Sequence, residues 1–375
     1  MPYPSTQIRS EITPAGELRL SLASAPAPDP GPDDVVVRID AAPINPSDLG
    51  LLLGPADVST AKLEGSAEAP VVVATVPAAL MGTVQARVGQ ALPVGNEGAG
   101  EVIACGTSEL ARSLLGRTVS IIGGPTYTQV RTLPAAACQA LPEGTSAEVG
   151  ASWFVNPMTV LGMVETMRAE GHAAIVHTAA ASNLGQMLCR VCADESVPLV
   201  NVVRRESQAE LLRGIGATHV VRSDLTGFAD DLDQAIRATG ATLVFDAIGG
   251  GPVGGQILAS MERVLAAKDG SYSRYGSTVH KQLYIYGSLD RSPTVLARAF
   301  GMAWGVGGWL LTPTLQKLGP ARVQAMRDRV VAGLETTFAS HYTSRISLAG
   351  ALSLDAIGAY ARQATGEKFL ITPSA

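Results

Sequence analysis

The chain has 375 residues, of which 46% are hydrophobic and 16% are charged. This balance excludes a disordered chain and indicates a folded protein with a sizeable core, and the length predicts about two domains. The net charge of −5 at pH 7 gives no sign of a nucleic-acid partner.

The first residues and the cysteines bear on the expected compartment. Residues 1–5 carry neither the basic nor the apolar region of a secretion signal. The longest apolar stretches, 71–80 and 302–311, are too short to cross a bilayer. The cysteines are too few and too scattered for a disulfide framework, which suits a reducing compartment. They are Cys105, Cys138, Cys189 and Cys192. We therefore expect a cytoplasmic protein with no membrane partner.

Residues 1–150 are predicted to form a β-rich domain, because short apolar runs of strand length are separated by turn-forming residues. The expected strands are residues 17–22, 35–39, 100–104, 118–122 and 127–133. Residues 59–90, rich in Ala, Val and Gly, interrupt this pattern as an insertion. Three interpretations remain open for this insertion: a lid, a hairpin at an interface, or a long loop.

Beyond residue 142, helices and strands alternate in the pattern of a parallel sheet with helices on both faces. The expected strands are residues 173–177, 199–203, 219–221, 242–246 and 282–286, and the expected helices are residues 158–169, 186–193, 207–214, 230–239 and 252–264. We predict an α/β fold, with a doubly wound Rossmann sheet over residues 151–300. Residues 301–375, which include a long helix at 321–334, are expected to return to the first domain.

Within this second part, residues 173–205 have the plan of a dinucleotide-binding unit: a strand, a tight turn, a helix and a second strand. The second strand normally ends in an acidic residue about 20 positions beyond the turn, where it binds the ribose hydroxyls. Here Arg204 and Arg205 stand at that place. A carboxylate would repel a ribose 2′-phosphate, whereas a guanidinium group can bind one bidentately. The pair therefore predicts NADPH as the cofactor in preference to NADH.

The turn itself is a weaker signal. Ser182 and Asn183 stand where a pair of glycines is expected. An ordinary parallel crossover that binds no ligand, with two solvated arginines, therefore remains an alternative to a nucleotide site.

Seven short motifs recur in the order of a known family. They are residues 44–48 (INPSD), 95–98 (GNEG), 155–159 (VNPMT), 201–204 (NVVR), 245–250 (FDAIGG), 284–287 (YIYG) and 366–368 (GEK). On these motifs the chain resembles the medium-chain dehydrogenase/reductase superfamily, and within it the zinc-free quinone oxidoreductases and 2-enoyl thioester reductases. The resemblance implies a GroES-like β-rich catalytic domain beside the Rossmann domain, and a homodimer.

Zinc-dependent alcohol dehydrogenases of the superfamily carry a Cys and a His at the positions that correspond to Asn45 and Asn96. Neutral amides are poor zinc ligands, and the Cys-rich lobe that holds structural zinc is absent. The resemblance therefore implies a zinc-free oxidoreductase that transfers hydride from NADPH to a quinone or an enone.

The resemblance also assigns site residues by position. The expected cofactor contacts are Asn45, Thr159, Ser182, Asn183, Leu184, Arg204, Arg205, Gly249, Gly250, Tyr286, Gly287 and Lys368. Asn45 would lie near the nicotinamide, and backbone N–H groups of residues 182–184 would approach the pyrophosphate at a helix N-terminus. Tyr286 and Gly287 would border the nicotinamide ribose, and Lys368 would close the site. A packing or capping role remains the alternative for Thr159 and Tyr286.

One departure from the family concerns the proton donor. Enoyl thioester reductases carry a tyrosine about ten residues after the Asn-Pro-Ser-Asp motif, but residues 51–57 contain none. Tyr127 is the candidate substitute, with core packing as its alternative. The missing tyrosine favours a quinone, or a similarly activated carbonyl, as the acceptor. An α,β-unsaturated carbonyl or enoyl thioester reductase, and a non-catalytic NADPH-binding sensor, remain open.

Overall fold

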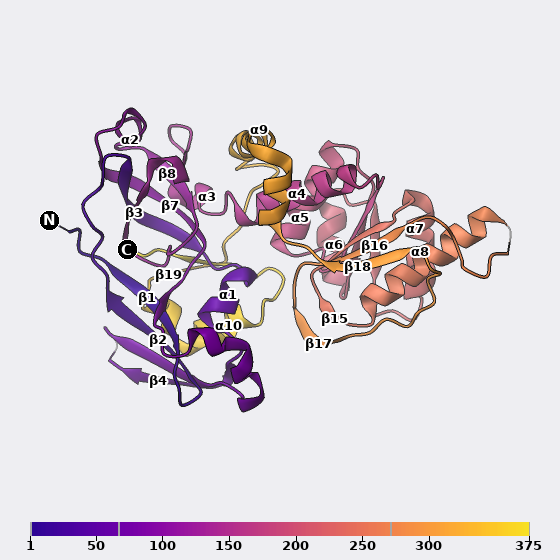
Figure 1. The fold of residues 1–375 in the computed structure, drawn as a ribbon, viewed down its shortest axis with the longest axis horizontal. Helices are drawn as coiled ribbons and strands as arrows, with labels where there is room; N and C mark the ends of the chain where they lie inside the picture. The colour runs from indigo at the N-terminus through magenta and orange to yellow at the C-terminus, as the bar shows by residue number, and fades with distance from the viewer. Residues whose placement is uncertain (1, 67, 271, 375) are drawn as a thin grey trace. The chain divides into compact units, whose positions relative to one another are not determined.

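The computed structural model describes residues 2–66, 68–270 and 272–374. The chain divides into two compact units, which are treated separately below (Figure 1). Unit 1 comprises Met1–Val155 and Val331–Ala375, and unit 2 comprises Asn156–Val330. The first boundary lies close to the expected division at 150, but the return to unit 1 comes about 30 residues later than the expected 301.

Unit 1 contains two mainly antiparallel sheets. One has the order β4-β5-β2-β1-β6, and the other the order β10-β8-β7-β3-β20-β19 with β9 paired to β3. Its strands are β1 (Thr6–Ile12), β2 (Glu17–Ser24), β3 (Asp34–Pro43), β4 (Asp57–Gly65), β5 (Pro70–Thr75), β6 (Leu92–Pro93), β7 (Glu97–Cys105), β8 (Thr118–Ile122), β9 (Val130–Pro134), β10 (Cys138–Ala140), β19 (Ser344–Ile346) and β20 (Phe369–Ile371). Its helices are α1 (Pro46–Leu52), α2 (Glu109–Leu114), α3 (Ala147–Gly150) and α10 (Leu354–Ala361). The predicted β-rich domain is confirmed.

The insertion at residues 59–90 forms a hairpin. Strands β4 and β5 pair with each other, and β5 adds to β2, so the hairpin extends a sheet of its own unit. A 3₁₀ segment (Ala78–Arg87) follows. At its end, Arg87 donates hydrogen bonds to the Leu51 carbonyl, at 2.9 Å, and to Ser10 Oγ, at 2.8 Å. The insertion is thereby fastened to the C-terminal end of α1.

Unit 2 is built around a six-stranded parallel sheet with the order β13-β12-β11-β14-β16-β18. The strands are β11 (Ile175–His177), β12 (Leu199–Val203), β13 (His219–Arg222), β14 (Leu243–Asp246), β16 (Lys281–Ile285) and β18 (Trp304–Gly308). Numbered along the chain, the order is 3-2-1-4-5-6, which is the dinucleotide-binding arrangement. Right-handed crossovers that run outward in two directions from β11 and β14 place helices on both faces. The predicted doubly wound sheet is confirmed.

The helices of unit 2 are α4 (Val155–Ala169), α5 (Asn183–Asp194), α6 (Glu206–Gly214), α7 (Phe228–Thr239), α8 (Val253–Asp269) and α9 (Leu311–Ala332), the last interrupted by Gly319. The first four helices agree with the predicted ones within three residues, whereas α8 ends five residues later than predicted and α9 begins ten residues earlier. Side chains of α7 and α8 form one buried cluster with the sheet, in which Leu232, Leu258 and Val244 are each 0% exposed. This cluster is the main core of unit 2.

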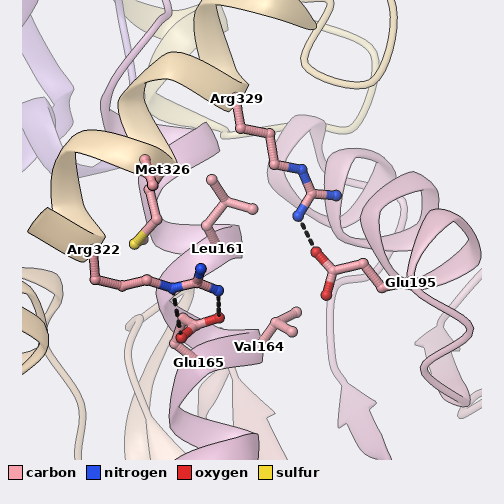
Figure 2. Close-up of a pocket in the computed structure, with 8 residues that line it drawn as sticks. Leu161, Val164, Glu165, Glu195, Arg322, Met326 and Arg329 are labelled. Atoms are coloured by element: carbon pink, nitrogen blue, oxygen red, sulfur yellow. Dashed lines mark hydrogen bonds and ion pairs between the residues drawn. The ribbon is translucent and has the colours of Figure 1, made fainter.

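Two features of residues 301–330 explain why the chain returns to unit 1 late. Strand β18 pairs with β16, and α9 is tied to the rest of unit 2 by ion pairs. Figure 2 shows Arg322 paired with Glu165 and Arg329 paired with Glu195, around a small pocket. The Arg322–Glu165 contact is bidentate, at 3.1 and 2.6 Å. The expected boundary at 301 is therefore corrected to 331.

A buried ion pair links α8 to the sheet. Lys281 Nζ lies 2.7 Å from Glu262 Oε2, and the two side chains are 0% and 9% exposed. Glu262 Oε1 also accepts the backbone N–H of Ser277, at 2.7 Å. Neither charge could remain buried without the other, because desolvation of a lone ion costs several kcal/mol.

We expect Lys281→Met to lower the free energy of unfolding by about 3–5 kcal/mol, because Glu262 would be left buried and unpaired. Urea unfolding followed by circular dichroism measures this. The double variant with Glu262→Gln keeps an acceptor for Ser277 and removes the lone charge, so it should recover most of the loss. Equal stability of the single and double variants would contradict the assignment.

Candidate cofactor and catalytic sites

In a doubly wound sheet, ligands bind outside the carboxyl ends of the strands, where the strand order changes direction. In unit 2 this point lies between β11 and β14. Thr178, directly after β11, donates from Oγ1 to Asp246 Oδ1 at 2.6 Å and accepts the N–H of Ala247 at 2.9 Å. Asp246 also accepts the N–H groups of Ile248 and Gly249. The Asp246 carboxylate thus holds the loop after β14 against the end of β11.

The turn between β11 and α5 lacks the usual glycines, but its backbone includes a left-handed residue of the kind that glycine normally supplies. Ala179 adopts a left-handed conformation, with φ +49°, which glycine adopts at lower cost. Ser182 caps α5 and accepts the Gly185 N–H at 3.1 Å. A Cβ at Gly185 would collide with the Ala180 carbonyl, so only glycine allows this approach of helix and turn. The N-terminus of α5 is therefore formed as in an anion-binding turn.

One of the three residues predicted to contact the pyrophosphate, Ser182, already uses its polar groups within the turn. The Ser182 N–H donates to the Ala179 carbonyl at 3.0 Å, and its hydroxyl oxygen serves the cap. Asn183 and Leu184 are the first residues of α5. Their backbone contact with a phosphate stays a prediction.

Arg204 and Arg205 follow β12 directly, and both are exposed. Their backbone N–H groups donate to Gln208 Oε1, at 3.1 and 3.2 Å. Among the described residues, neither guanidinium group forms an ion pair. The Ser292 N–H is the main cause that lowers the pKa of Asp290, and the positive charge of Arg204 adds a smaller effect. The next acid along the chain, Glu206, is bound instead by two other arginines. These are Arg213, at 2.8 Å, and Arg222, at 2.6 Å.

Gly249 and Gly287 allow two loops to pack closely together. Gly249 has φ +79°, and a Cβ there would lie 2.7 Å from the Gly287 carbonyl oxygen. Residues Gly249–Gly251 form the short strand β15, which pairs with β17 (Asp290–Thr294). Gly250 also allows a close approach of the two loops, because a Cβ at this position would lie 2.6 Å from the Ser292 carbonyl oxygen. Packing of the two loops requires these glycines, while their contact with a cofactor stays a prediction.

Tyr286 is held by a histidine at the carboxyl edge of the sheet. His177 is the last residue of β11, and its Nε2 lies 2.7 Å from Tyr286 Oη, with the two rings stacked at 5.9 Å. Burial lowers the pKa of His177 to about 3, and burial, helped by Asp246, raises the pKa of Tyr286. Thr159 is buried within α4, and its contact with a cofactor also stays a prediction.

In unit 1 a buried carboxylate organises the second candidate site. Asn45, which precedes α1, donates from Nδ2 to Glu97 Oε1 at 2.8 Å, and Glu97 Oε2 accepts the N–H groups of Phe154 and Val155 at 3.0 and 2.8 Å. The Asn45 N–H donates to Asp48 Oδ2 at 2.7 Å. Glu97 is 0% and Asn45 2% exposed.

Lys368 belongs to the same buried group. Its Nζ donates to Ser152 Oγ at 3.0 Å and to Ser340 Oγ at 3.3 Å, and Ser152 Oγ lies 2.8 Å from Tyr342 Oη. Burial lowers the pKa of Lys368 to about 8, although the negative charge of Glu97 opposes the shift. Burial also raises the pKa of Glu97. Asn45 is thus hydrogen-bonded to Glu97, and Lys368, far from both in sequence, lies near enough for the charge of Glu97 to act on it.

Sequence reasoning missed Glu97 as a site residue, although it lies within the motif at 95–98. The signal was available, since an acid at the start of an apolar strand has to find partners once it is buried. Its neighbour Asp48 is also buried, and burial raises the pKa of Asp48 to about 7. Two buried acids thus lie close to one buried amine.

The structure corrects the candidate role of Tyr127. Its side chain is 0% exposed and its hydroxyl donates to the Pro43 carbonyl at 3.0 Å. Burial, and then the charge of Asp48, raises the pKa of this phenol. Its proton is therefore committed to the backbone, in agreement with the packing alternative.

Comparison with known proteins agrees with this architecture. No family model matches the chain. A Mesorhizobium loti structure with the provisional name NADPH:quinone reductase covers 100% of the chain and 99% of its own, at 23% identity and a TM-score of 0.73. A Pseudomonas syringae quinone oxidoreductase (20% identity, TM-score 0.67) and a mutant Candida tropicalis enoyl thioester reductase (19%, 0.65) each match 98% of the chain and 100% and 99% of their own. The chain has the medium-chain dehydrogenase/reductase fold.

The curated relatives match a shorter part of the chain. The synaptic vesicle membrane protein VAT-1 homolog of Rattus norvegicus is 30% identical over 164 residues, which are 42% of this chain and 40% of the relative. The chain thus matches about two fifths of the length of that relative. The fold expected from the seven sequence motifs is confirmed by the structural matches.

Two further properties of the described residues bear on the site. They contain no group of three or more His, Cys, Asp or Glu side chains arranged to hold a metal ion. Asn45, at the position of a zinc-binding cysteine in related alcohol dehydrogenases, donates to Glu97 instead. Within the described part of the chain, no helix combines the length and the apolar character needed to span a membrane.

We expect Asn45→Asp to destabilise the protein by about 2 kcal/mol at pH 8, because it places a third carboxylate beside Glu97. Repulsion between the new carboxylate and Glu97 raises the pKa of both groups in the folded state. As the pH falls toward 5, the folded protein therefore binds more protons than the unfolded chain, and the loss of stability shrinks. Urea unfolding at both pH values measures this. Asn45→Ala removes the same amide without adding charge, so its loss should depend less on pH; identical pH profiles would refute the argument.

Proposed function

We propose that the protein is a zinc-independent, NADPH-dependent oxidoreductase that reduces a quinone or a similarly activated carbonyl compound. The observation that carries this proposal is the placement of Arg204 and Arg205 at the end of β12, in a parallel sheet of dinucleotide-binding order. The names of the structural neighbours, which include NADPH:quinone reductases and enoyl thioester reductases, support the same class.

The residues of unit 2 fit NADPH. Positive charge near the N-terminus of α6 costs roughly 0.3–1 kcal/mol for each arginine, and a bound 2′-phosphate would offset that cost. The nearest acid along the chain, Glu206, is already bound by Arg213 and Arg222. The guanidinium groups of Arg204 and Arg205 would therefore be available to a bound anion. The N-terminus of α5 would hold the pyrophosphate.

The residues of unit 1 supply polar groups that suit a nicotinamide and a carbonyl acceptor. Asn45 Oδ1 is buried without a hydrogen-bond partner among the described residues, so it would accept from a carboxamide N–H. Lys368 has three N–H donors, two of which are bound by Ser152 and Ser340. When bound, the cofactor supplies the hydride. The chain binds and orients the reactants and places positive charge near an oxygen that becomes negative.

A second candidate is reduction of an α,β-unsaturated carbonyl compound or an enoyl thioester. One structural neighbour is described as a complex with NADP and crotonyl-CoA, at 18% identity and a TM-score of 0.67. Against this candidate, residues 51–57 lack the tyrosine of the enoyl reductases and Tyr127 is buried. A non-catalytic NADPH-binding sensor is the remaining alternative.

We also propose, by analogy with the fold family, that the protein works as a homodimer in the cytoplasm. The four free cysteines support a reducing compartment. Size-exclusion chromatography with light scattering tests the dimer.

Replacing Arg204 and Arg205 together with Ala should weaken NADPH binding about 30-fold and leave NADH binding nearly unchanged, because only NADPH carries the 2′-phosphate. Titration of nicotinamide fluorescence measures both dissociation constants. Arg237→Ala is the matched control, because Arg237 lies in the last turn of α7, before β14 and thus at the opposite edge of the sheet. Equal losses for the two cofactors would assign these arginines a structural role.

Rapid-mixing absorbance at 340 nm should show NADPH oxidation by 1,4-benzoquinone, slower oxidation by an enone, and the slowest by crotonyl-CoA. The order follows from the missing acid, since a quinone needs no proton at carbon. Fastest reduction of crotonyl-CoA would favour the second candidate. Tight NADPH binding without oxidation by any of the three would favour the sensor.

A further inference from the structure

The His177–Tyr286 pair carries an inference about the acceptor, and this inference rests on the proposed function. Both residues lie at the carboxyl edge of the parallel sheet: His177 ends β11 and Tyr286 follows β16, with β14 between the two strands. Asp246, which ends β14, accepts the backbone N–H of Tyr286 at 3.0 Å. The tyrosine is therefore fixed by its backbone as well as by its hydroxyl.

The protonation of His177 decides which way the Tyr286 hydroxyl points. His177 is 0% exposed, its Nε2 lies 2.7 Å from Tyr286 Oη, and its Nδ1 is buried with no hydrogen-bond partner among the described residues. Such burial keeps the ring neutral, with its pKa lowered to about 3, so it carries a single N–H. A buried N–H without an acceptor is rarer and less favourable than an unpaired acceptor. The proton therefore belongs on Nε2, where Tyr286 Oη accepts it.

With its oxygen accepting from His177, Tyr286 keeps its own proton for another partner. The residue keeps part of its surface exposed, and a phenol, whose ordinary pKa is about 10, is protonated at neutral pH. The hydroxyl stands at the edge where a doubly wound sheet receives its ligand. We propose that Tyr286 donates a hydrogen bond to the carbonyl oxygen of the acceptor, and that His177 is the positioning residue that turns the hydroxyl toward it.

The tautomer is tested on the free protein, without cofactor or activity. Nitrogen-15 NMR of protein labelled at its five histidines, with His177→Gln for assignment, should show the His177 proton on Nε2 between pH 6 and 8. A proton on Nδ1 would mean that Tyr286 donates to the histidine, which would overturn the proposal. This result does not depend on whether the proposed function is correct.

The donor role is tested with Tyr286→Phe, which keeps the stacked ring and removes only the hydroxyl. We expect kcat/KM for 1,4-benzoquinone to fall about 100-fold, as when a donor to a developing oxyanion is lost, while the dissociation constant for NADPH changes less than about twofold. Tyr284→Phe is the matched control two residues earlier in the chain, since the Tyr284 hydroxyl donates to Glu170 at 2.7 Å. An equal weakening of NADPH binding would assign the hydroxyl to the cofactor and overturn the proposal.

Two further measurements separate this inference from the proposed function. Binding of benzoquinone to the NADP⁺-loaded protein, where no reduction can occur, should weaken about fivefold in Tyr286→Phe and not in Tyr284→Phe; an unchanged constant would count against the donor. If no acceptor is turned over, the proposed function fails, and this constant and the tautomer still decide the inference. His177→Phe should lower kcat/KM while KM changes little, and His177→Gln, whose amide can donate, should restore part of it.

Discussion

The buried carboxylate of Glu97 is the interaction on which the architecture of unit 1 depends. It binds the amide of Asn45 after β3 and two backbone N–H groups at Phe154 and Val155, and its charge acts on Lys368. A carboxylate that is 0% exposed is tolerated only when hydrogen bonds and an opposite charge compensate the lost water. Segments separated by more than 200 residues are therefore held in one arrangement before any ligand binds.

A different constraint governs unit 2, where parallel strands bring all their carboxyl ends to one edge. The turn after β11, the arginines after β12, the Asp246 loop after β14 and Tyr286 after β16 meet there by topology. Glycine stands where backbones approach closely, as at Gly185 and Gly249. Elsewhere a strained alanine at 179 and a serine cap replace it, and a left-handed residue of this kind costs about 1–2 kcal/mol. The loss of the usual glycines thus leaves the geometry of the turn intact.

How much the sequence could predict depended on whether the signal was local. Strands 118–122 and 199–203 are observed with the predicted bounds, because both are short runs dominated by apolar, mainly β-branched residues. Strand β18, with the sequence WGVGG, has no periodic pattern, and its omission led to the boundary error at 301. Of the site, the arginines after β12 were predictable from spacing. Glu97 and the His177–Tyr286 pair were missed, because their partners lie 52 and 109 positions away and only the folded chain brings them together.

The groups that the chain can direct at a ligand also bear on its substrate. Reduction of an enoyl thioester needs a proton at carbon in addition to charge stabilisation at oxygen, and the tyrosine that serves this purpose in enoyl reductases is missing from residues 51–57. Tyr127 cannot replace it, because its hydroxyl is bound to the Pro43 carbonyl within the core. The donors that we propose, the Lys368 ammonium group and the Tyr286 hydroxyl, are both suited to an oxygen. Because a quinone develops its negative charge on oxygen alone, it makes the smaller demand on these residues, and the chemistry of the chain favours it over the thioester.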